Sequence, residues 1–133
     1  MIRRGDKARR ATATVELAIL LPFLAIIFFM AVDYGRIFYY TQVLDNCARN
    51  GAAWLADSNS ATKSPYLTVT AAAQADASNL STLPSVSSSS GTDANNHPWV
   101  KCTVTWTFTT VVNYPGVPSS VSLTRSCQMR TQN

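Results

Sequence analysis

The sequence of 133 residues predicts an α+β fold, in which a long transmembrane helix continues as an amphipathic helix and packs on a small antiparallel β-sheet. The uncharged residues 17–32 predict the membrane-spanning part. Apolar residues at helical spacing predict its continuation, and strict alternation after Trp99 predicts strands. The chain divides into a basic leader (1–11), this helix (12–56), a Ser/Thr-rich connection (57–98) and a β-hairpin region (99–133).

Basic residues crowd the first ten positions, where Asp6 is the one acidic residue, so this segment has a net charge of +4. That equals the formal net charge of the whole chain, because the remaining basic and acidic residues cancel. A nucleic-acid-binding domain spreads its basic residues over a folded face, so the pattern argues against a nucleic-acid partner. The basic residues are Arg3, Arg4, Lys7, Arg9 and Arg10.

The apolar run 17–32 is bracketed by Glu16 and Asp33. At about 1.5 Å per residue it covers roughly 24 Å of a ~30 Å hydrocarbon core, and helix from Ala11 to Tyr40 makes up the difference. Basic residues before the run and aromatic residues after it predict a single pass, with the N-terminus cytoplasmic and the C-terminal part translocated. The alternative is a cleaved secretory signal, although no A-x-A-like site follows the run.

Helical periodicity continues beyond the membrane to Ala56. Asp45 and Arg49 are spaced for an ion pair on the polar face. Pro22 is expected to kink or loosen the apolar half, because it removes one backbone hydrogen bond. The apolar stripe needs a cover, for which the C-terminal domain is the candidate. The stripe consists of Ile37, Tyr40, Leu44, Cys47, Gly51 and Trp54, with Ala48 and Leu55 beside it.

Composition changes after Asp57, since fifteen of the 37 residues from 58 to 94 are Ser or Thr. Residues 67–70 are predicted as a short strand and residues 71–80 as a short helix. Residues 81–96 have too little apolar area to order themselves and are predicted as a flexible surface loop.

The C-terminal region predicts a β-hairpin, because residues 99–112 and 121–129 both alternate. Turn residues lie between them, in the sequence Asn-Tyr-Pro-Gly at 113–116. A turn centred on this tetrapeptide pairs residues of like character, whereas a slip of one residue would face apolar side chains with polar ones. The predicted pairs are Phe108 with Val121, Trp106 with Leu123, and Cys102 with Cys127.

In this register Cys102 and Cys127 face each other, so a disulfide between them is predicted in an oxidising compartment. The alternative is that both remain reduced as small buried side chains. Cys47 lies on the helix stripe and is interpreted as a packing residue. Three such widely spaced cysteines do not resemble a zinc site, so no metal is predicted.

No catalytic constellation is recognisable in the sequence. The one histidine, His97, precedes Pro98 in a predicted loop, and the carboxylates are scattered. There is also no glycine-rich phosphate loop. We therefore expect a protein that is not an enzyme and needs no cofactor. Asn79-Leu80-Ser81 is formally a glycosylation sequon, a tripeptide that arises easily by chance in a Ser-rich chain.

Four features occur together and in order in the N-terminal part: RRATATVELA at 9–18, Leu21-Pro22, Asp33-Tyr34-Gly35-Arg36 and Ala48-Arg49-Asn50-Gly51-Ala52. They resemble the TadE-like minor pilins, or pseudopilins, of bacterial tight-adherence pilus systems. The resemblance covers residues 3–56, and the β region only in its general character. Those proteins resemble type IV pilins, so a type IV pilin-like arrangement of helix and small periplasmic domain is implied.

The resemblance implies that a prepilin peptidase cuts between Ala11 and Thr12, although the family usually has glycine before the cut. Glu16 would then be the fifth mature residue, with a role in assembly. A carboxylate at the edge of hydrocarbon is costly alone, and the cut would create an α-amino group one helical turn away on the same or a neighbouring subunit. The alternative is that Glu16 lies in the headgroup layer, where its charge suits the helix dipole.

The resemblance implies a minor pilin-like subunit or assembly factor of a Tad/Flp-type pilus, or of a related secretion apparatus, that acts in adhesion by helix–helix association. Its expected partners are membrane lipid, other pilus or pseudopilus subunits and assembly proteins, and a prepilin peptidase. Its expected location is the bacterial inner membrane with the folded domain periplasmic, or the extracellular pilus. The alternative is a membrane-anchored periplasmic binding module, unrelated to pili, whose hairpin surface recognises a ligand.

Overall fold

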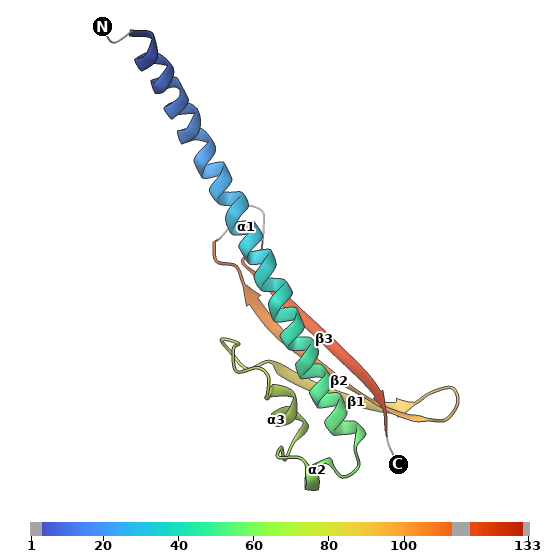
Figure 1. The fold of residues 1–133 in the computed structure, drawn as a ribbon. Helices are drawn as coiled ribbons and strands as arrows, with labels where there is room; N and C mark the ends of the chain where they lie inside the picture. Colours follow the sequence, from blue (N-terminus) through green and yellow to red (C-terminus); the bar gives the residue numbers. More distant parts are fainter. Residues whose placement is uncertain (1–3, 113–117, 132–133) are drawn as a thin grey trace. The chain divides into compact units, whose positions relative to one another are not determined.

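The structure is a computed structural model that describes residues 4–112 and 118–131. The predicted α+β fold is confirmed, and residues Met1–Gly35 and Arg36–Asn133 form two compact units. The elements are helices α1 (Arg4–Ala56), α2 (Ser60–Lys63) and α3 (Val69–Gln74), then strands β1 (Ser85–Thr92), β2 (Pro98–Thr109) and β3 (Ser120–Arg130) (Figure 1).

In the described part of the unit Met1–Gly35, residues 4–35, the chain forms α1. The helix begins at Arg4, inside the segment predicted as the leader, and it runs through Pro22 without interruption. From Val15 to Val32 its large apolar side chains are exposed, as Ile19 at 71% and Phe28 at 64% illustrate. Exposure on all sides suits a helix surrounded by lipid, and α1 is long and apolar enough to cross a membrane.

The unit Arg36–Asn133 contains a three-stranded antiparallel sheet in the order β1-β2-β3. The predicted hairpin register is confirmed, because Phe108 pairs with Val121, Trp106 with Leu123, and Cys102 with Cys127. The predicted turn at 113–116 lies outside the described residues. The alternating residues Val100, Cys102, Val104, Trp106 and Phe108 of β2 are all buried, as predicted.

The prediction of a flexible loop over 81–96 is wrong, because β1 lies within it and pairs with β2 from Ser85↔Thr105 to Thr92↔Pro98. Two side chains outside β1 anchor the chain that leads into it. Gln74 Nε2 donates to the Pro84 carbonyl at 2.9 Å, and Trp106 Nε1 donates to Thr82 Oγ1 at 3.1 Å. Tertiary hydrogen bonds thus order a segment that has little apolar area of its own.

The predicted strand over 67–70 is also wrong, because residues there enter α3. Thr68 is the N-cap of this helix, and its hydroxyl accepts a hydrogen bond from the Ala71 N–H at 3.2 Å. The helix predicted over 71–80 is present as the shorter α3, with Ala72 and Ala73 buried.

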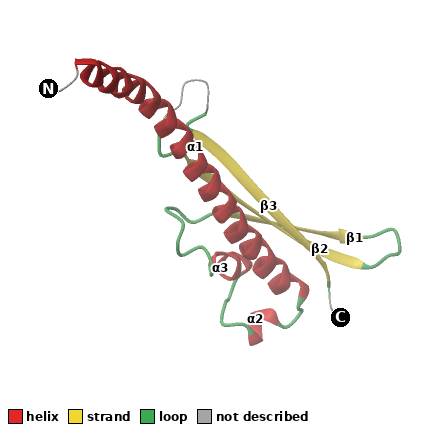
Figure 2. Ribbon diagram, turned by 45° about the horizontal axis from the view of Figure 1, so that its top comes forward, coloured by secondary structure: helices red, strands yellow, loops and turns green. Residues whose placement is uncertain are grey.

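The C-terminal part of α1 covers the sheet face that carries the buried β2 side chains (Figure 2). Small α1 residues bring the helix close, since a Cβ placed on Gly51 would overlap the Sγ of Cys102. Asp45 pairs with Arg125 of β3 at 3.6 Å, and not with Arg49 as helical spacing predicted. Besides the β2 residues, the core contains Val43, Leu44, Cys47, Ala48, Ala52, Ala73, Ala77 and Leu123.

Candidate assembly helix

The apolar segment of α1 is the first candidate for function, because a soluble protein rarely exposes so much contiguous apolar surface. From Val15 to Val32 the large apolar side chains are between 38% and 71% exposed. Such a surface fits either lipid or other apolar helices. Inside a bilayer the same residues can contact either lipid or another apolar helix, so the segment can exchange lipid neighbours for protein neighbours.

The residues predicted for processing and assembly lie in one continuous stretch of α1. Ala11 and Thr12, the predicted cleavage site, are within the helix, and Glu16 follows Thr12 by one turn. Glu16 is exposed, as are its apolar neighbours Val15 and Leu17. Cleavage before Thr12 would therefore place a new amino group on the helix end closest to this carboxylate.

All three cysteines are free thiols in this structure. Cys102 and Cys127 are Cα partners on β2 and β3, which is the register that a disulfide between them requires. The disulfide itself stays a prediction. Burial, and then the neighbouring Cys127, raises the pKa of the Cys102 thiol. Cys47 is fully buried in the helix–sheet core, which agrees with its interpretation as a packing residue.

His97 lies in the β1–β2 connection beside Asp93. Its Nδ1 is 3.6 Å from Asp93 Oδ1, and Asp93 Oδ2 accepts a hydrogen bond from Arg130 Nη2 at 3.0 Å. These contacts fasten the β1–β2 turn to the end of β3. Within residues 4–112 and 118–131 no group of three or more His, Cys, Asp or Glu side chains is arranged to hold a metal ion.

One contact of the N-terminal motifs was not predicted. The Arg36 guanidinium carbon lies 5.0 Å from the centre of the Phe108 ring and 5.9 Å from that of Tyr40, within range of a cation–π interaction. The ring of Trp106 completes the cluster, 4.9 Å from Tyr40. Arg36 belongs to a motif that the sequence singled out, but its aromatic partner on β2 is distant in sequence.

The comparisons with known proteins concern this same helix. No curated protein and no solved structure matches the chain. The family model described as TadE-like protein matches residues 11–53, from the predicted cleavage site to the last turn of α1. The TadE-like resemblance predicted from the sequence is therefore confirmed for residues 11–53.

Proposed function

We propose that the protein is a minor pilin-like (pseudopilin) subunit or assembly factor of a Tad/Flp-type pilus or a related secretion apparatus. The observation that carries the proposal is the TadE-like match over residues 11–53, which associates this segment with Tad pilus systems. The exposed apolar surface of the same segment supports it, because subunits that assemble through their helices need such a surface before assembly.

The proposed mechanism is association of helices within the bilayer. The apolar part of α1 holds the subunit in lipid until apolar helices of other subunits replace the lipid. After cleavage between Ala11 and Thr12, the carboxylate of Glu16 pairs with the α-amino group of Thr12 on its own or a neighbouring helix. The pair neutralises two charges that would each be costly in an apolar surrounding.

Substitution of Glu16 tests the proposal against a passive anchor. A passive anchor should tolerate Glu16→Ala, since a charged side chain costs about 2.5–3.5 kcal/mol at the helix centre and less near the interface. In an assembly subunit Glu16→Ala should abolish assembly, whereas Glu16→Asp, which keeps the carboxylate, should retain part of it. Assembly is scored by pilus formation and by co-purification with other pilus proteins from membranes that contain equal amounts of each variant.

Cleavage is followed separately by mass spectrometry of the N-terminus. Ala11→Phe should block processing, because a peptidase that accepts glycine or alanine before the cut has little room for a bulky side chain, whereas Glu16→Ala should still be cut. If Glu16→Ala assembles as well as the parent chain, the pairing mechanism fails. The headgroup explanation of Glu16 is then the better one.

A further inference from the structure

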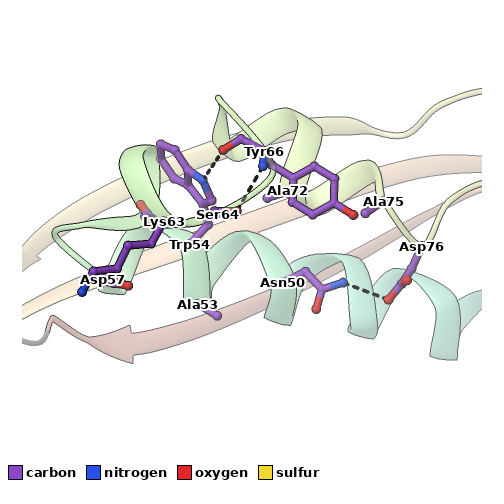
Figure 3. A pocket seen from close by; sticks show the side chains of 11 residues that line it. Asn50, Ala53, Trp54, Asp57, Lys63, Ser64, Tyr66, Ala72, Ala75 and Asp76 are labelled. Carbon is purple, nitrogen blue, oxygen red and sulfur yellow. Dashed lines mark hydrogen bonds between the residues drawn. The ribbon is translucent and has the colours of Figure 1, made fainter.

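A surface cavity in the folded unit lies outside the helix used by the proposed function. Its volume is about 440 Å³, and its lining comes from the end of α1, from α2 and the turn after it, and from α3 and the turn after it (Figure 3). All of these residues belong to the unit Arg36–Asn133. Small-molecule sites have volumes of about 300–1,000 Å³, so the cavity is large enough for a ligand.

Two aromatic side chains form walls of the cavity. Trp54 Nε1 donates a hydrogen bond to the Tyr66 carbonyl at 3.0 Å, and the Tyr66 N–H donates one to Ser64 Oγ at 3.2 Å. In Figure 3 the Tyr66 ring extends between Ala72 and Ala75. Tyr66 is held through its backbone, and 39% of its surface remains exposed. The cavity therefore offers two aromatic rings beside small apolar side chains, and the Trp54 ring is held by its own hydrogen bond.

The two ends of the cavity carry polar side chains, which include acidic and basic groups (Figure 3). At one end Asn50 Nδ2 donates to Asp76 Oδ2 at 2.8 Å. At the other end lie Lys63 and Asp57, whose Oδ1 accepts the Asn59 N–H at 2.9 Å. In the part of the chain that the structure describes, the charged side chains of Asp57, Lys63 and Asp76 form no ion pair.

This mixture of charges selects the chemistry of the ligand. The carboxylates of Asp57 and Asp76 repel an anion, and Lys63 repels a cation from its end of the cavity. A hydroxyl group donates to a carboxylate and accepts from an ammonium or an amide, so a neutral polyhydroxylated ring can bond to every polar group present. The C–H face of the same ring packs on an aromatic wall.

We propose that the cavity binds a neutral saccharide unit of one or two sugar rings. Trp54 and Tyr66 contact its apolar face, and the polar groups at the two ends of the cavity bind its hydroxyls. Binding of this kind is independent of helix assembly, because the cavity and the apolar segment of α1 share no residue. Failure of one proposal therefore leaves the other standing.

The test uses the full chain in a polyoxyethylene detergent, because a detergent with a sugar headgroup would compete. Hexoses, deoxyhexoses, N-acetylhexosamines and their disaccharides are titrated one at a time. Binding is followed by saturation-transfer NMR of the sugar and by tryptophan fluorescence. We expect saturable binding of at least one of these sugars, with a Kd of about 1 mM or tighter.

Two variants locate the site. Tyr66→Ala removes the ring but keeps the backbone carbonyl and N–H that the fold uses, and it should weaken binding at least ~10-fold, which corresponds to about 1.4 kcal/mol. Leu67→Ala is the matched control, because Leu67 is the next residue, is 81% exposed and does not line the cavity. It should bind as the parent chain does, and circular dichroism checks that both variants are folded.

Three results would overturn the proposal. The first is absence of sugar binding at concentrations up to ~10 mM. The second is binding of choline or lysine amide in place of any sugar, which would identify a cation site. The third is sugar binding that Tyr66→Ala leaves unchanged while the variant remains folded, which would place the sugar elsewhere on the chain.

Discussion

At the scale of single residues, the separation of α1 from the sheet depends on the absence of a side chain at position 51. The Sγ of Cys102 occupies the space that a Cβ on Gly51 would need, and the Cβ of Ala73 lies 3.1 Å from that position. Interiors packed at this density do not admit an extra methyl group without displacement of a neighbour. Glycine at this site is therefore a packing requirement, although it weakens the helix.

We expect Gly51→Ala to destabilise the folded unit by about 1–3 kcal/mol, the usual cost of overpacking a core. Thermal unfolding followed by tryptophan fluorescence measures this, because all three tryptophans lie in Arg36–Asn133. Gly35→Ala is the control, since a Cβ there meets nothing within 4 Å. Cys102→Ala in the same chain should remove much of the cost. An equal cost in both backgrounds would show that Cys102 is not its cause.

A second residue-scale prediction concerns acid. The N–H groups of His97 and then Asn95, together with the Arg130 guanidinium, hold the pKa of Asp93 below its ordinary value, although partial desolvation opposes them. An Asp whose pKa is lower in the folded than in the unfolded state adds stability at pH values above its unfolded pKa, which is about 3.9. That stability is lost as the pH falls through the folded-state pKa. Asp93→Asn should therefore destabilise the chain near neutral pH and lose less stability on acidification below ~4. Parallel pH profiles of parent and variant would refute this.

At the scale of elements, the hairpin could be predicted and β1 could not. β2 carries apolar side chains at every second position, and β3 does so except at Arg125, so a shift of one residue would face apolar side chains with polar ones. β1 has the sequence SVSSSSGT, in which Val86 is the one large apolar residue. Its strand conformation comes from pairing with β2 and from the hydrogen bonds that hold residues 82–84. The amino-acid composition of residues 81–96 indicates neither this pairing nor these hydrogen bonds.

The candidate sites divide in the same way. Ala11, Thr12 and Glu16, the residues proposed for processing and assembly, are neighbours in sequence, so a local motif was enough to propose them. The cavity of Figure 3 joins residues from α1, α2 and α3 that are up to 26 positions apart, as in the bond between Asn50 and Asp76. Only the packing of those helices brings them together, and a single sequence carries no pattern for it.

The register of β2 and β3 leads to a prediction about the cysteines. In an oxidising compartment we expect one disulfide, between Cys102 and Cys127, with Cys47 free, because the first two are facing residues on adjacent strands. Trypsin cuts after Arg49, Lys101, Arg125 and Arg130 and so places each cysteine in a different peptide. Non-reducing peptide mapping should find residues 102–125 linked to 126–130. A bond that includes Cys47 would contradict the prediction.

At the scale of the whole molecule, α1 is one continuous helix with two parts, one that exposes apolar side chains and one that packs against the sheet. From Val15 to Val32 its large apolar side chains are exposed, and from Val43 to Ala56 one stripe is buried against the sheet. The TadE-like match covers both parts and stops before the sheet begins. The family model thus describes α1 and not the sheet.

Orientation in the membrane is the last prediction. Five basic residues lie within the first ten positions, whereas the basic and acidic residues of the rest of the chain cancel, so the N-terminus should remain cytoplasmic. A reporter that needs disulfides, fused after Asn133, should be active, and one that fluoresces only in the cytoplasm should be dark. Replacement of the five basic residues by Gln should reduce this asymmetry, because it removes the charges that retain the N-terminus. A fusion active only in the cytoplasm would reverse the topology and remove the oxidising compartment that the disulfide requires.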